Sequence, residues 1–237
     1  MSSIFENGEG LLLSVSGGKD STAMILYMKE IAIDQDKLEY VFMDTGWESV
    51  ETYSYLDYLE SNLDIKINRI RAKVKIKDEH EDIYRTCLNL MGREHSSFVA
   101  TILNKTMFPA GAFQWCTSIL KIDPFKLFLN ELDYQPISCV GIRRAESKRR
   151  SNYSECFPCI RSNKKEMKEF INTEKHIEVI RILERYNSNI KGRQVTFFKG
   201  GPIDEILNWS KTSRGGKQYF LFDTEQPTCE KWGMCGI

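Results

Sequence analysis

The stretch that most restricts the fold of this chain is SVSGGKDST at residues 14–22, which lies between an apolar run and a helix-like run. LLL at residues 11–13 is typical of a short buried strand, whereas AMILYMKE, which starts at residue 23, places apolar residues at helical spacing. Glycines at such a junction let the backbone pass close to a ligand and turn its N–H groups toward it. The sequence therefore predicts a strand–loop–helix unit that binds an anion.

Polar side chains in the same stretch predict that the bound anion is a chain of phosphates. The positive end of the following helix favours negative charge, and Lys19 adds a mobile ammonium group. The pattern G-x-x-x-x-G-K-[ST] of the common P-loop is absent, so this would be a different phosphate-binding loop. A glycine-rich turn that binds no ligand is the alternative. Further hydroxyl donors belong to Ser14, Ser16, Ser21 and Thr22.

Strand-like and helix-like segments alternate through the first half of the chain. Most of the strands are short apolar runs that stop at a polar turn or a glycine, and the third alternates apolar with basic residues. Ser49 suits the N-cap of the second helix. This order predicts an α/β fold with a parallel sheet covered on both faces. The expected strands cover residues 10–16, 38–46, 64–72 and 135–143, and the expected helices cover residues 20–33, 49–63, 80–91 and 117–132.

The character of the chain changes after about residue 150. A long charged region with helical character covers residues 163–190, and cysteines gather near the end of the chain. No internal repeat or low-complexity linker separates the two parts. We therefore expect a nucleotide-binding α/β domain at residues 1–150 and, packed on it, a helical extension with a cysteine cluster at residues 151–237.

The amino-acid composition says more about where in the cell the protein is expected than about which molecules it binds. Lys and Arg number 33, as do Asp and Glu, so the net charge says nothing about an anionic partner. No apolar run approaches the roughly 20 residues that span a bilayer, and the N-terminal residues do not resemble a signal peptide. We expect a cytoplasmic protein without a membrane segment, whose seven cysteines form no structural disulfides. Cys87 and Cys139 lie in apolar patterns and are expected in the core.

Four motifs, in this order along the chain, resemble those of a known protein family. SGGKDS at residues 16–21 resembles the pyrophosphate-binding PP-loop of the adenine-nucleotide alpha-hydrolase-like superfamily. FMDTGWESVETYSYLD at residues 42–57, WCTSILKIDPF at residues 115–125 and GIRRAESKRR at residues 141–150 resemble motifs of the phosphoadenosine phosphosulfate (PAPS) reductase family. Four ordered motifs are far more specific than one. The resemblance implies a Rossmann-like (HUP-type) fold.

The resemblance also implies a reaction. Proteins of this superfamily bind ATP, with Mg²⁺ expected on the triphosphate, and cleave it between the α and β phosphates, usually adenylating an acceptor. PAPS reductases proper lack the Gly-Gly-Lys core of the loop, whereas this chain keeps Gly17, Gly18 and Lys19. Lys19 and the two glycine amides would hold the β and γ phosphates, and Ser16 and Ser21 would bond the same oxygens. The chain is therefore most similar in character to the ATP pyrophosphatases of DNA phosphorothioation systems.

Four other residues in these motifs are expected at the nucleotide, namely Asp20, Asp44, Gly46 and Lys121. Asp20 would place Mg²⁺, or it would only cap the helix. Asp44, followed by Gly46, ends the second strand and would contact ribose, adenine or metal, unless it is a plain turn acid. Lys121 would join the anion site, unless it is an exposed lysine of an amphipathic helix.

Five cations crowd into eight positions after the fourth expected strand. They would repel one another without an anion, and the planar arginine group binds phosphate through two hydrogen bonds. A solvated basic turn is the alternative. We expect Arg143 and Arg149 to bind the nucleotide, and Arg143 to act in catalysis with Lys19 and Asp20. The five are Arg143, Arg144, Lys148, Arg149 and Arg150.

Two close cysteine pairs point to a metal site. Cys156 and Cys159 form CFPC, and Cys229 and Cys235 lie near the end of the chain. Four thiolates suit zinc or a [4Fe–4S] cluster. The resemblance favours the cluster, because Cys116 and the CFPC pair match cluster ligands of the adenylyl-sulfate reductase branch, which leaves Cys229 or Cys235 as the fourth. The opposing interpretation is that CGI at residues 235–237 resembles the C-terminal nucleophile of PAPS reductases, which would make Cys235 catalytic.

The resulting hypothesis is an ATP pyrophosphatase that adenylates an acceptor so that sulfur from a partner can replace its oxygen. A cysteine desulfurase would be the sulfur donor, and a nucleic acid is one possible acceptor. The first alternative is a thiol-dependent sulfonucleotide reductase that uses Cys235. The second is a regulatory protein that binds a nucleotide without turnover.

Overall fold

The four expected strands form one parallel sheet in the computed structural model of the protein. The structure describes residues 10–31, 37–109, 115–141, 174–198 and 200–211. The strands are β1 (Leu11–Val15), β2 (Leu38–Met43), β3 (Ile67–Ile70) and β4 (Ile137–Cys139), in the spatial order β3-β2-β1-β4.

The order of the strands reverses at β1. Val15 of β1 pairs with Phe42 of β2, and Leu13 of β1 pairs with Cys139 of β4, all in parallel register. From β1 the chain first adds β2 and β3 on one side and later returns to add β4 on the other. Open α/β sheets bind ligands at such a reversal, outside the carboxyl ends of the strands. The fold therefore favours a ligand site beside the loop that follows β1.

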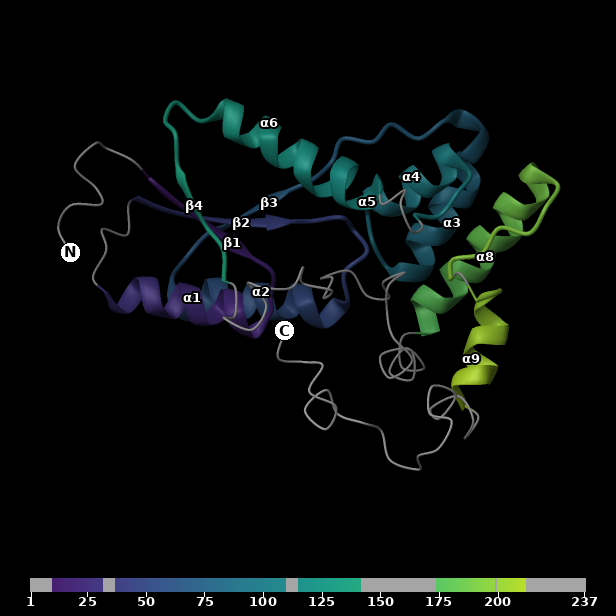
Figure 1. Ribbon diagram of the computed structural model, residues 1–237, viewed down its shortest axis with the longest axis horizontal. Helices are drawn as coiled ribbons and strands as arrows, with labels where there is room; N and C mark the ends of the chain where they lie inside the picture. The colour runs from purple at the N-terminus through teal and green to yellow at the C-terminus, as the bar shows by residue number, and fades with distance from the viewer. Residues whose placement is uncertain (1–9, 32–36, 110–114, 142–173, 199, 212–237) are drawn as a thin grey trace, which may run out of the picture.

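Helices cover both faces of this sheet, which confirms the Rossmann-like α/β prediction. Figure 1 shows α1 (Lys19–Glu30) and α2 (Val50–Leu63) on one face and α6 (Asp123–Glu131) on the other. Ser49 is the N-cap of α2, as expected, and its hydroxyl accepts the amide of Thr52. A hydrophobic cluster joins the strands to α1 and α2. Its buried members are Leu11, Leu13, Val15, Ile25, Leu38, Tyr40, Phe42, Leu56, Leu59 and Ile67.

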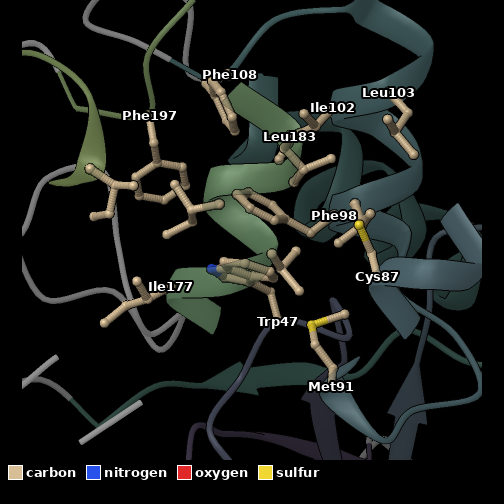
Figure 2. Packing of buried hydrophobic residues seen from close by; sticks show 14 of the residues in the cluster. Trp47, Cys87, Met91, Phe98, Ile102, Leu103, Phe108, Ile177, Leu183 and Phe197 are labelled. Atoms are coloured by element: carbon tan, nitrogen blue, oxygen red, sulfur yellow. The ribbon is translucent and has the colours of Figure 1, made fainter. Parts of the chain in front are cut away.

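A second, larger hydrophobic cluster lies among helices beyond the carboxyl ends of the strands. Figure 2 shows Trp47 packed among Met91, Phe98 and Ile177, which belong to three different helices. Trp47 directly follows the turn after β2, so this cluster anchors that turn. Most of its helical members belong to α3 (Glu81–Met91), α4 (Ser97–Lys105), α8 (Glu174–Lys191) and α9 (Ile203–Lys211).

The charged helical region expected at residues 163–190 is described from residue 174 onward, as α8. This helix packs against α3 and α4. The domain boundary expected at residue 150 lies outside the described residues and stays a prediction. None of the described helices is both long and apolar enough to cross a membrane.

The helix expected before β4 contains a widened turn. α5 (Trp115–Thr117) leads into η3 (Ser118–Ile122), a π-helical turn that continues into α6. Pro124 has no N–H group, so it cannot donate a hydrogen bond to the carbonyl four residues before it. In the widened turn, the amide of Asp123 donates to the carbonyl of Ser118, five residues before it. The wider turn accommodates the proline without ending the helix.

Candidate functional site

The loop after β1 turns sharply at Gly17. This residue has a φ of +72°, in the left-handed region that costs other residues about 1–2 kcal/mol. A Cβ atom here would also lie 3.2 Å from Cγ2 of Thr52 in α2. Both the backbone conformation and the neighbouring helix therefore favour glycine at this position.

Two serine hydroxyls brace this loop from inside. Ser21 Oγ donates to the carbonyl of Gly18 at 3.0 Å and accepts the amide of Ser16 at 3.2 Å. Because the Ser21 proton is used in this way, Ser16 Oγ donates to Ser21 Oγ across 3.0 Å and accepts the amide of Gly18 at 3.3 Å. The expected phosphate contacts of both serines stay predictions. In this structure the two hydroxyls fix the shape of the loop.

The outer side of the loop presents donors to an anion. Gly18 is the N-cap of α1, and Asp20 lies in the first turn of this helix. Gly18 and Lys19 are exposed. Within the described part of the chain, neither the amide of Gly17 nor the ammonium group of Lys19 has a hydrogen-bond partner. Together with the positive end of α1, these groups suit a phosphate.

β4 ends in close contact with the first turn of α1. A Cβ atom on Gly141 would lie 2.6 Å from the carbonyl oxygen of Asp20 and 3.1 Å from the amide nitrogen of Ser21. Glycine therefore lets the two backbones approach each other. Arg143 and Arg149 follow two and eight residues later, outside the described residues. The chain thus enters its arginine-rich segment from a point beside the phosphate-binding loop.

A buried carboxylate, Asp44, follows β2 at the same edge of the sheet. Its Oδ2 pairs with Arg71 Nε at 2.7 Å, while its Oδ1 accepts the Tyr53 hydroxyl at 2.5 Å and the Gly46 amide at 3.0 Å. His95 Nε2 lies 3.4 Å from Oδ2 without hydrogen-bond geometry. Burial disfavours the charge, but His95, Tyr53 and Arg71 together hold the pKa of Asp44 well below its usual value. The carboxylate is therefore ionised.

These contacts direct the carboxylate of Asp44 into the protein and away from solvent. Its side chain is 0% exposed, so the expected contact with ribose, adenine or metal would require it to give up a partner. The side chain of Arg71 is 50% exposed, and among the described residues only its Nε is engaged. Asp44 thus holds Arg71 at the carboxyl edge of the sheet, with the other guanidinium donors accessible to an anion.

A second buried carboxylate, Glu48, shares the hydroxyl of Tyr53 with Asp44. Tyr53 Oη lies 2.9 Å from Glu48 Oε2. Burial and the charge of Glu48 raise the pKa of Tyr53, so the hydroxyl stays protonated. Thr45 donates its hydroxyl to Glu48 at 2.6 Å, and Arg93 lies 4.2 Å over the Tyr53 ring while donating to the Glu48 carbonyl at 2.6 Å. This network makes the turn after β2 rigid.

Sequence reasoning did not assign a site role to most of this network. The residues concerned are Glu48, Tyr53, Arg71, Arg93 and His95. One signal was present, because acids directly after β2 and an arginine directly after β3 fall at the edge where parallel sheets bind ligands. Nothing in the sequence around Arg93 and His95 marked them, since they lie in the connection between α3 and α4.

The other expected site residues lie further from the loop or outside the described chain. Ser14 lies within β1, and Lys121 is half-buried in η3. Cys116 is half-buried in α5 and packs against the larger hydrophobic cluster. The expected residues outside the described ranges are Arg143, Arg149, Cys156, Cys159, Cys229 and Cys235.

The two cysteines expected in the core are found in apolar surroundings. Cys87 is fully buried, and this burial raises the pKa of its thiol to about 12. Cys139 is half-buried, and burial likewise raises its pKa. Among the residues that the structure describes, no three His, Cys, Asp or Glu side chains gather as a metal site. The four cysteines beyond residue 150 lie outside the described residues.

Comparison with known families gives one match over most of the chain. Residues 10–171 match the model described as "Phosphoadenosine phosphosulfate reductase domain". This range includes the phosphate-binding loop, the turn after β2, α5 with η3, and the arginine-rich segment. No solved structure matches the chain.

Three curated proteins that are similar to part of the chain have names that state no function. A protein of Methanocaldococcus jannaschii is 31% identical over 140 residues, which cover 58% of this chain and 23% of that protein. A second protein of that organism is 27% identical over 135 residues, covering 56% of this chain and 26% of its own length. A 37.8 kDa protein of Escherichia phage 186 is 31% identical over 168 residues, covering 59% and 49%. The chain thus spans between about a quarter and a half of these relatives.

Proposed function

The chain belongs to the phosphoadenosine phosphosulfate reductase domain family, a nucleotide-using family with a PP-loop, and from this premise we propose that it is an ATP pyrophosphatase. It would adenylate an acceptor and prepare it for sulfur transfer. The observation that carries the proposal is the intact Gly17-Gly18-Lys19 turn at the carboxyl end of β1. A triphosphate has terminal phosphates for this turn to bind, whereas a sulfonucleotide has none there.

The proposed first step is an in-line displacement at the α phosphorus. An acceptor oxygen forms the new bond to phosphorus, the α–β phosphoanhydride bond breaks, and pyrophosphate leaves with the electron pair. Lys19 and the amides at the start of α1 stabilise the charge that grows on pyrophosphate. Bound Mg²⁺ would neutralise part of that charge, and Asp20, in the first turn of α1, is the carboxylate proposed to hold it.

The residues that follow β2 and β3 would act on the same nucleotide from the side. Arg71 offers its outer guanidinium donors to a phosphate or to the acceptor. Asp44, Tyr53 and Glu48 act as positioning residues, because they hold Arg71 and the turn rather than touch the ligand. Arg143 and Arg149 would approach from the end of β4, which Gly141 brings to the first turn of α1.

Sulfur transfer would follow at the adenylated centre. A persulfide on a cysteine desulfurase is the proposed source, with its outer sulfur attacking the acceptor, AMP leaving with the oxygen, and a dithiol reductant completing the release. We propose that Cys116, Cys156 and Cys159 hold a [4Fe–4S] cluster with Cys229 or Cys235, because this thiol set suits such a cluster, which transfers electrons in many proteins. The full chain, when it is purified without oxygen, should contain iron and sulfide. Colourless protein with stoichiometric zinc would contradict the cluster and leave the nucleotide site untouched.

Turnover of α-labelled ATP tests the nucleotide chemistry. The full chain, with Mg²⁺, a cysteine desulfurase, cysteine and nucleic acid acceptors, should form AMP and pyrophosphate in equal amounts. Lys19→Ala should lower this rate roughly 100-fold, because one lost stabilising group has that effect in other active sites. Lys66→Ala removes another exposed lysine, at the amino end of β3, and should leave the rate unchanged.

Other results of that assay would reject the proposal. No AMP under any of these conditions, or equal rates for Lys19→Ala and the unchanged protein, would contradict an ATP pyrophosphatase. Sulfite release from PAPS with thioredoxin, lost in Cys235→Ser, would identify a reductase instead. Tight ATP binding without turnover would identify a nucleotide-binding regulator.

A further inference from the structure

The segment between β3 and α3 carries a row of cations on one side. Residues 71–77 read RAKVKIK, so that Arg71, Lys73, Lys75 and Lys77 alternate with apolar residues. All four cations are exposed, whereas Ala72 is buried, and Val74 and Ile76 pack half-buried against the larger hydrophobic cluster. The alternation is that of an extended chain, in which every second residue points the same way. We call these four residues the basic strip.

Helix α4 holds the basic strip in its extended form. Ser97 donates its hydroxyl to the carbonyl of Ala72 at 2.7 Å. Asn104, two turns later, donates to the carbonyl of Lys75 at 2.8 Å and accepts the amide of Lys77 at 3.1 Å. Figure 1 shows this segment as the long connection that runs from β3 to α3. The spacing of the cations is therefore fixed by hydrogen bonds and by the apolar residues between them.

The middle of the basic strip is not neutralised by acids. Among the described residues, Lys73 and Lys75 have no ion-pair partner, whereas the preceding Arg69 is paired with Asp57 and Glu60. At the far end, Lys77 Nζ lies 3.8 Å from a carboxylate oxygen of Glu79, a long and exposed contact. Cations that lack acidic partners and lie at a fixed spacing attract a polyanion whose negative charges are regularly spaced as well.

We propose that the basic strip binds the sugar–phosphate backbone of a nucleic acid. Alternate residues of an extended chain repeat every 6.6 Å or so, which brings a row of cations to a row of phosphates. The apolar residues of the segment face inward, so a protein partner would find no apolar anchor and a membrane no side chain to insert. Binding of a phosphate backbone requires only the positive charges of the basic strip. No base is read by these lysines, so binding is independent of sequence.

The basic strip starts at the proposed active site. Arg71 is its first member, and Arg71 is also the residue that Asp44 holds at the carboxyl edge of the sheet. A nucleic acid bound along Lys73 and Lys75 would have one end beside the phosphate-binding loop. The strip thus deepens the proposed function by naming the acceptor class, and in that respect it rests on the proposed function. The binding itself needs no turnover.

Oligonucleotide binding by the full chain tests the proposal. Fluorescence anisotropy with a labelled single strand and a labelled duplex, titrated from low to moderate salt, should show an affinity that falls linearly on a log–log plot. Lys73→Glu and Lys75→Glu should each weaken binding roughly tenfold and lower the slope by about one. The matched control Lys66→Glu makes the same charge change at the other end of β3 and should bind like the unchanged protein.

Measurements on the same variants separate this proposal from the proposed function. Lys73→Glu and Lys75→Glu should keep ATP binding in the absence of nucleic acid, whereas Lys19→Ala should lose ATP affinity and keep oligonucleotide affinity. Equal losses in Lys66→Glu and Lys73→Glu would overturn the basic strip. So would binding to polyglutamate or to anionic lipid vesicles that exceeds binding to either oligonucleotide at the same salt. Neither result would touch the ATP site.

Discussion

His176 and Trp47 join the turn after β2 to α8. Their rings meet edge to face with centroids 4.7 Å apart, and Trp47 is fully buried. His176 is buried as well, and its Nε2 has no hydrogen-bond partner in the described structure. Burial first, and then the charge of Arg93, lowers the pKa of His176 from 6.5 to about 4. At neutral pH the folded protein therefore holds an uncharged imidazole in its core.

This imidazole makes stability depend on pH. The unfolded chain binds the proton more tightly, so the contribution of His176 is complete above pH 6.5 and is lost as the pH falls toward 4. The free energy of unfolding should fall by roughly 1 kcal/mol per pH unit across this window. His176→Phe keeps an aromatic ring against Trp47 and should remove that part of the loss.

Urea unfolding at several pH values between 7 and 4 measures this effect. The profiles of the unchanged protein and of His176→Phe should diverge as the pH falls, since the other groups that titrate are shared. Parallel profiles would show that His176 is not the group responsible.

Whole elements differed in how well the sequence predicted them. β1 and β2 were recognisable because short apolar runs end at glycine or at a polar turn. α4 was not, because its residues 97–103 are all buried, so the segment shows no polar face at helical spacing. The π-helical turn η3 was also missed, although Pro124 marked the place where the helix had to change.

Site residues also differed in how well the sequence predicted them. The loop at residues 16–21 was predictable because its function depends on local features, namely glycines, a lysine and a helix start. The network around Asp44 was not, because it joins α2, the end of β3 and the α3–α4 connection. Sequence patterns of strands and helices do not show which loops meet. The strand order decides that.

At the scale of the whole molecule, the reversal at β1 explains why the site is where it is. The order β3-β2-β1-β4 brings the ends of β1 and β4 together, and Gly141 lets β4 touch the first turn of α1. β2 and β3 end at the same edge, where Asp44 follows β2 and Arg71 follows β3. The larger hydrophobic cluster then fixes the turn through Trp47.

The most direct test of this account compares the binding of ATP and of AMP to the full chain by calorimetry, with Mg²⁺ present. If the loop after β1 binds the terminal phosphates, ATP should bind at least roughly tenfold more tightly than AMP, since charge-assisted contacts contribute about 1.5–3 kcal/mol each. Lys19→Ala should lose most of that preference, and Lys66→Ala should retain it. Equal affinities for ATP and AMP, or an undiminished preference in Lys19→Ala, would contradict the account.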